Sequence, residues 1–202
     1  MRFQNMAPLE IMAFYKLDKL SAADIQPICE RWMELDLGGD EVACLAFEPC
    51  LDLWSNKRDI DAAFAEVLGD LKLSRHEATW LVFRNFISNL LAAKNDANDL
   101  LSKVINLTYE NFPPLFQRTD NNYAANEFGI EGLYGIYYSR DHLPEWPPNS
   151  LGWPFGLSKE FEEFKTEMKT EAEAVLERFF SSDSELPETL HRVQRLVSET
   201  NC

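Results

Sequence analysis

The sequence lacks the long apolar runs that mark membrane proteins and exported proteins. No stretch approaches the eighteen or so consecutive apolar residues of a membrane span. The first eight residues contain no apolar core of a signal peptide, and Glu10, Lys16 and Asp18 interrupt the apolar residues that follow. We therefore expect a cytoplasmic protein that does not bind membranes.

Cysteine and histidine are also scarce, and their spacing fits no metal site. The four cysteines form no CxxC pair, and the three histidines take part in no HxxxH, HxxE or ExxH pattern. We expect Cys29, Cys44 and Cys50 to be small buried apolar residues in helices, and Cys202 is the last residue. The sequence predicts neither a metal ion nor a cofactor.

Basic residues are outnumbered, with 19 Lys and Arg against 34 Asp and Glu, so the formal net charge is -15. The negative charge is spread over the whole chain, since the parts before and after residue 110 carry similar net charges. A field of this sign repels nucleic acid and anionic lipid and attracts basic proteins. Acidity that serves only solubility is the alternative interpretation. We expect no nucleic-acid partner, and a basic protein partner is compatible with the charge.

Alternating β-type patterns are scarce, whereas helical signals recur along the whole chain. The clearest are an apolar stripe from Ile60 to Leu71 and a capping box of Ser74 and Glu77. Pro27 is expected in the first turn of a helix for which Ser21 and Asp24 are the candidate N-caps. Other helices are predicted from Pro8, from Asp40, after Asp96, over residues 126–139, from Ser158 and near Pro187. The pattern predicts an all-α, multi-helix bundle of about eight helices.

Residues 110–157 differ from the rest of the chain in composition. They hold six of the ten prolines and five of the eight glycines, together with several aromatic residues. A linker would be poor in aromatics, so we predict an ordered, loop-rich cover over the helices. The chain then forms a single helical domain over residues 1–202, or two lobes over 1–110 and 126–202.

Three glycines at every third position, Gly129, Gly132 and Gly135, invite comparison with a phosphate-binding loop. Such a loop needs a preceding strand and usually a Lys, Ser or Thr on the phosphate, and Glu131 would repel an anion. We instead expect a smooth helix edge on which another element packs closely.

Two groups of residues are candidates for binding a protein partner. The first is an acidic ridge on the outer face of the helix after Ser158, for which a solvated face is the alternative. Its members are Glu160, Glu163, Glu167 and Glu171. The second group suits an interface hot spot, with a core wedge as the alternative. Its members are Tyr134, Tyr137, Tyr138 and Arg140.

The most enzyme-like pair is Asp141 and His142, since a carboxylate can orient an imidazole. Adjacent residues seldom hydrogen-bond in that way, so a surface turn is the preferred interpretation. We predict no catalytic residue and no cofactor-binding residue, and we do not expect an enzyme.

The size, the acidity and the stretch from Leu100 to Leu143, which includes the run from Tyr123 to Tyr134, carry a resemblance to a known class. The chain resembles bacterial immunity proteins of contact-dependent growth inhibition and other polymorphic toxin systems, in particular a mainly helical family. The resemblance implies a cytoplasmic inhibitor that binds a toxin domain, often a basic nuclease, and occludes its active site. A small helical enzyme of unknown reaction and a helical adaptor or regulatory protein are the alternatives. The sequence leaves the oligomeric state open.

Overall fold

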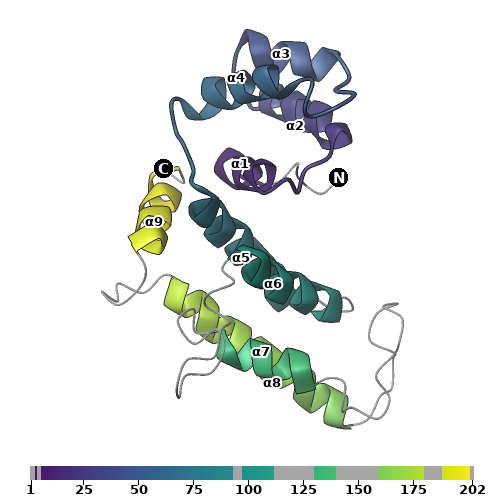
Figure 1. Ribbon diagram of the computed structural model, residues 1–202, viewed down its shortest axis with the longest axis vertical. Helices are drawn as coiled ribbons and strands as arrows, with labels where there is room; N and C mark the ends of the chain where they lie inside the picture. Colours follow the sequence, from purple (N-terminus) through teal and green to yellow (C-terminus); the bar gives the residue numbers. More distant parts are fainter. Residues whose placement is uncertain are drawn as a thin grey trace. The chain divides into compact units, whose positions relative to one another are not determined.

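The computed structural model describes Phe3 and residues 6–92, 97–111, 130–139, 159–179 and 188–200. Over these residues the chain forms nine helices and no strand, which confirms the predicted all-α class (Figure 1). Most of the predicted loop-rich cover, at 112–129 and 140–157, lies outside the described residues.

The helices follow the predicted order closely. Their bounds are α1 Pro8–Lys16, α2 Ala22–Glu34, α3 Asp40–Phe47, α4 Lys57–Leu68, α5 Arg75–Ala92, α6 Ala97–Asn111, α7 Glu131–Ser139, α8 Lys159–Phe179 and α9 Glu188–Thr200. Leu71, predicted as the last apolar position of the fourth helix, follows the end of α4, because Gly69 adopts a positive φ of 65° that a helix cannot continue.

By its internal contacts the chain divides into two compact units. Unit 1 comprises Met1–Ala78 and Val197–Cys202, and unit 2 comprises Thr79–Leu196. The division falls within α5, whereas the sequence pattern suggested lobes on either side of residues 110–126.

Unit 1 is built around α2, α3 and α4, with α3 packed on both of its neighbours and α1 packed on α4 (Figure 1). Its core contains an aromatic cluster. The ring of Phe64 stacks on Tyr15 at a centroid distance of 5.4 Å and meets Trp32 edge to face at 5.3 Å. Trp32 and Phe64 are each 3% exposed, so this cluster joins α1, α2 and α4.

Local hydrogen bonds explain where α2 and α5 begin. The Asp24 carboxylate accepts hydrogen bonds from the Ser21 N–H and hydroxyl at 2.8 and 2.6 Å. The predicted capping box before α5 is confirmed, because the Ser74 N–H donates to the Glu77 carboxylate and the Glu77 N–H donates to the Ser74 hydroxyl. Pro27 lies inside α2, beyond its first turn, so that expectation was wrong.

Cys44 corrects another expectation, because its side chain is exposed while Cys29 and Cys50 are buried. On α3, Val42, Leu45 and Ala46 form the buried face. At 100° per residue, position 44 points to the opposite side of the helix.

The Cys29 thiol on α2 is buried. Burial, followed by the neighbouring Cys50 and Glu66, raises the pKa of this thiol to about 12, so it stays protonated at neutral pH.

Unit 2 joins α5 to the later helices through contacts distant in sequence. The Trp80 indole N–H on α5 donates to the Thr189 hydroxyl on α9 at 3.2 Å. The Arg84 guanidinium lies 6.0 Å from the centre of the Phe179 ring on α8. In addition, α7 packs on both α6 and α8. These contacts place α7 and α8, which carry the residues predicted to bind a partner, in one unit.

Candidate functional site

The acidic ridge predicted on α8 is only partly exposed. Glu163 and Glu167 are exposed, whereas Glu171 is half-buried, and the side chain of Glu160 lies outside the described residues. The buried face of α8 is formed by Met168, Ala172, Val175 and Phe179. A row of residues at i, i+4 and i+8 advances by about 40° per step around a helix. The row therefore turns from solvent toward the buried face as it reaches Glu171.

Glu171 packs directly against Gly132 of α7. A Cβ atom added at Gly132 would lie 2.1 Å from Glu171 Oε2, far inside van der Waals contact. This confirms the prediction of close packing at the glycine edge for Gly132, although the approaching group is a side chain and not a backbone. At Gly135 the added Cβ would meet nothing within 4 Å, so only Gly132 of the two described glycines on this edge is approached closely. Gly129 lies outside the described residues.

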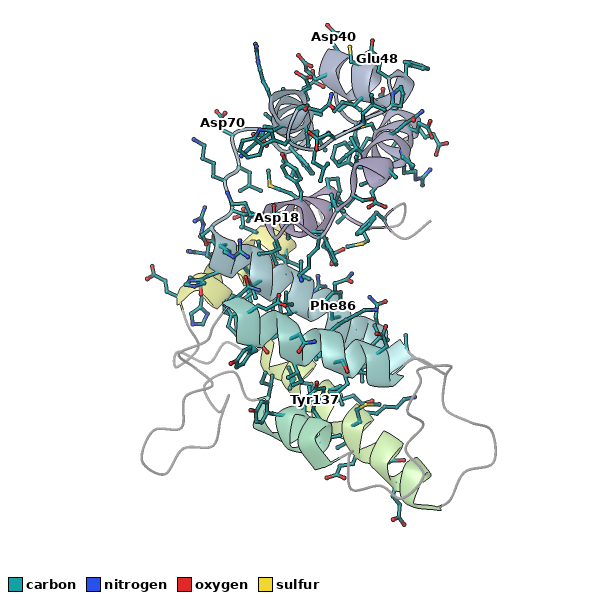
Figure 2. All side chains as sticks on the ribbon, turned by 45° about the vertical axis from the view of Figure 1, so that its right-hand side comes forward. Asp18, Asp40, Glu48, Asp70, Phe86 and Tyr137 are labelled. Atoms are coloured by element: carbon teal, nitrogen blue, oxygen red, sulfur yellow. The ribbon has the colours of Figure 1, made fainter. Side chains whose placement is uncertain are left out.

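The predicted aromatic group on α7 is described only in part. Tyr134 and Tyr137 are half-buried, and Figure 2 marks the latter on α7. The side chain of Tyr138 and all of Arg140 lie outside the described residues, as do Asp141 and His142. Half-buried tyrosines suit a core position as well as an interface, so this prediction stays a prediction.

More than half of the chain's net negative charge lies in unit 1, on α2, α3, α4 and their connections. Residues 22–70 contain 12 acidic and 3 basic side chains, a net charge of -9 out of the chain's -15. Ten of these acidic residues are exposed, among them Asp40 and Glu48 at the two ends of α3 (Figure 2). By the same count α8 holds seven acidic and four basic residues, a net charge of -3. Residues 22–70 therefore hold more than half of the chain's net charge, whereas α8, which is less than half as long, holds a fifth of it.

Large apolar side chains are exposed within the same stretch. Phe47, Leu51 and Trp54 are 77%, 87% and 82% exposed. We call residues 47–54 the exposed apolar segment. Single exposed apolar residues are ordinary, whereas several of the largest kind within eight residues are typical of an interaction surface. Sequence reasoning missed this segment because apolar residues are expected inside unless the fold shows otherwise.

Hydrogen bonds hold the backbone of the exposed apolar segment in place. The Asp52 carboxylate accepts from the Ser55 N–H and the Ser55 hydroxyl, each at 2.8 Å. These donors lower the pKa of Asp52, and the Trp54 N–H contributes to the same shift. The buried Cys50 thiol lies 3.7 Å from both the Asp52 carbonyl oxygen and Asn56 Oδ1. The segment is thus an ordered loop with one side chain anchored inside it.

The start of α3 is closed by a carboxylate from another helix. Glu66 on α4 accepts hydrogen bonds from the N–H groups of Gly39, Glu41 and Val42 at 2.8, 3.0 and 3.0 Å. Burial raises the pKa of Glu66 and the three donors lower it, with a net shift downward. A negative charge here satisfies donors that have no partner within the helix. Glu66 therefore holds the N-terminus of α3 on α4.

We expect Glu66→Gln to destabilise the protein by about 1 kcal/mol at neutral pH. Because the folded-state pKa of Glu66 is depressed, its contribution is present above the ordinary value of 4.5 and is lost as pH falls through the lower folded value. Urea unfolding at neutral pH and well below pH 4.5 checks this, with Glu30→Gln as an exposed control. If the difference in the free energy of unfolding between wild type and Glu66→Gln persisted at low pH, this prediction would be contradicted.

A cavity of about 380 Å³ also lies in unit 1, between α1, α4 and residues 69–73. Tyr15, Lys16 and Asp61 are among the polar residues that line it. Burial, followed by the charge of Asp61, raises the pKa of Tyr15, so its hydroxyl is a hydrogen-bond donor at neutral pH. Carboxylates and lysines both line the cavity, so its charge favours neither an anion nor a cation.

Among the described residues no group of His, Cys, Asp and Glu is arranged to hold a metal ion. No helix in the described ranges is long and apolar enough to cross a membrane.

Comparison with protein-family models, with curated proteins and with solved structures finds no match to this chain.

Proposed function

We propose that this protein is an immunity-type inhibitor that binds a basic toxin domain, such as a nuclease, and occludes its active site. The observation that carries the proposal is the net charge of -9 on residues 22–70, most of it on exposed side chains. A nuclease binds a polyanion, and a dense set of carboxylates competes for the same positive field.

Charge of this density acts mainly on the rate of encounter. Complementary charge steers two proteins together and raises the association rate, while buried apolar contacts set the dissociation rate. In this proposal the acidic surface of α2, α3 and α4 provides most of the steering. The ridge on α8 contributes less, since its net charge is -3.

Co-expression with basic toxin nuclease domains, one at a time, tests the proposal, and one of them is expected to be neutralised. We expect rescue of growth and co-purification of the two proteins. If neither occurs, the immunity function is wrong. Binding to a basic host protein without any effect on a toxin would favour the adaptor alternative, and turnover of a small molecule would favour the enzyme alternative.

Matched charge reversals compare the two acidic surfaces. Glu30→Lys with Glu48→Lys and Glu163→Lys with Glu167→Lys each change the charge by the same amount at exposed positions. We expect the first pair to slow association with the toxin domain about tenfold at low salt and to flatten its salt dependence. The second pair should have a smaller effect. Stopped-flow association rates that are unchanged in both pairs would show that acidity does not steer binding.

A further inference from the structure

The exposed apolar segment is thermodynamically unfavourable in water unless something covers it. Phe47, Leu51 and Trp54 are each more than three quarters exposed. Burial of a side chain of this kind is favourable relative to its exposure. Large aromatic side chains of this sort are also the usual anchors of protein interfaces. The segment is therefore suited to provide the apolar centre of an interface.

The segment is already ordered without a partner. Asp52 holds Ser55 through two hydrogen bonds, Cys50 is buried beneath the loop, and Glu48 N–H donates to the Cys44 carbonyl oxygen at 2.9 Å. The Lys57 ammonium lies 5.9 Å from the centre of the Trp54 ring, within the range of a cation–π interaction. Binding then requires little further ordering of the loop, which favours affinity.

Charge decides which kind of surface covers the segment. Glu48 and Asp52 lie within it and are exposed, and residues 22–70 around it carry -9. A second copy of the chain would bring like charges together, and an anionic lipid surface would be repelled. An apolar pocket with Lys and Arg at its rim matches both the apolar side chains and the carboxylates.

We propose that residues 47–54 insert into an apolar pocket rimmed by Lys and Arg on a basic protein partner, with Trp54 and Leu51 as the anchors. This rests on the proposed function only for the identity of the partner as a toxin domain. Asp52 is a positioning residue that presents the two anchors, since its hydrogen bonds fix the turn between them.

The test uses Leu51→Ser with Trp54→Ser in the full chain, and Tyr109→Ser as a control at a 60% exposed ring on α6. We expect the double variant to weaken binding of the toxin domain found by co-expression at least 100-fold, through faster dissociation measured by surface plasmon resonance. Tyr109→Ser should bind as the wild type does. Asp52→Ala should weaken binding about tenfold while the apolar side chains remain. Circular dichroism should match the wild type in every variant, and urea midpoints should match it in all but Asp52→Ala, which loses two hydrogen bonds within the loop.

Equal binding by wild type and double variant would overturn the inference while leaving the proposed function in place. If the toxin domain does not bind the wild type, the proposed function fails, and a display library of small basic domains then serves as the probe. Binders selected on the wild type should be lost on the double variant and retained on Tyr109→Ser. Binders that are indifferent to the substitutions would contradict the inference. So would a wild-type dimer in sedimentation velocity that the double variant abolishes, because a second copy would then be the occupant.

Discussion

Trp32→Ala is expected to destabilise unit 1 by about 3–5 kcal/mol, the usual range for removing a buried tryptophan. Its indole is 3% exposed on α2 and meets the Phe64 ring edge to face, at 5.3 Å and 73°. The substitution removes this aromatic contact and leaves a cavity beside Phe64, which also stacks on Tyr15. A loss of this size is a large share of a domain's total stability.

Urea unfolding followed by far-UV circular dichroism measures the effect. Trp54→Ala is the matched control, because the same chemical change at an 82% exposed ring should alter stability by less than about 0.5 kcal/mol. Trp32→Phe should recover much of the loss by refilling part of the space. If Trp32→Ala and Trp54→Ala were equally stable, the aromatic cluster would not be the core of unit 1.

Gly38→Ala is expected to destabilise the protein by about 3–4 kcal/mol, through backbone strain and steric overlap together. Gly38 has φ of +91°, which residues with a Cβ rarely adopt. An added Cβ would lie 2.4 Å from Val42 Cγ2 and 2.8 Å from Val42 Cβ. Val42 is fully buried on α3 and has no room to move, so α3 itself would have to shift.

Gly69→Ala separates the two contributions. Gly69 also has a positive φ, of +65°, but an added Cβ there would meet nothing within 4 Å. We expect about 1–3 kcal/mol from backbone strain alone, because φ +65° with ψ −154° is a conformation that essentially only glycine adopts. Thermal and urea unfolding of both variants give the difference, which measures the overlap with Val42. Equal losses for Gly38→Ala and Gly69→Ala would mean that this overlap relaxes without penalty.

Of these two substitutions, Gly38→Ala bears on the proposed interface, because its added Cβ meets Val42 on α3. This helix ends at Phe47 and leads directly into the exposed apolar segment, and the N-terminus of α3 is held by Glu66. A partner would therefore contact a loop whose entry is set by packing inside unit 1. Loss of binding in Trp54→Ala without loss of stability would separate recognition from folding.

Parts of the candidate site could not have been predicted from the sequence. Glu171 has the right spacing for a solvent-facing ridge, yet Gly132 of another helix leaves room for its carboxylate. Cys44 has apolar neighbours but lies on the outer side of α3. Phe47 and Trp54 belong to residue types that are usually buried, and hydrophobicity alone predicts the opposite of their exposure.

The sequence by itself determined the all-α class, the order of the helices and the excess of negative charge. Capping boxes such as Ser74 with Glu77, and apolar stripes at helical spacing, depend on residues three or four positions apart. Only the tertiary structure decided which side chains remain at the surface. The exposure of a side chain depends on contacts with residues far along the chain. Glu66 accepts a hydrogen bond from the N–H of Gly39, 27 positions away, and Glu171 packs against Gly132. Local patterns carry no information about such contacts, so the exposed apolar segment emerged only from the packed helices around it.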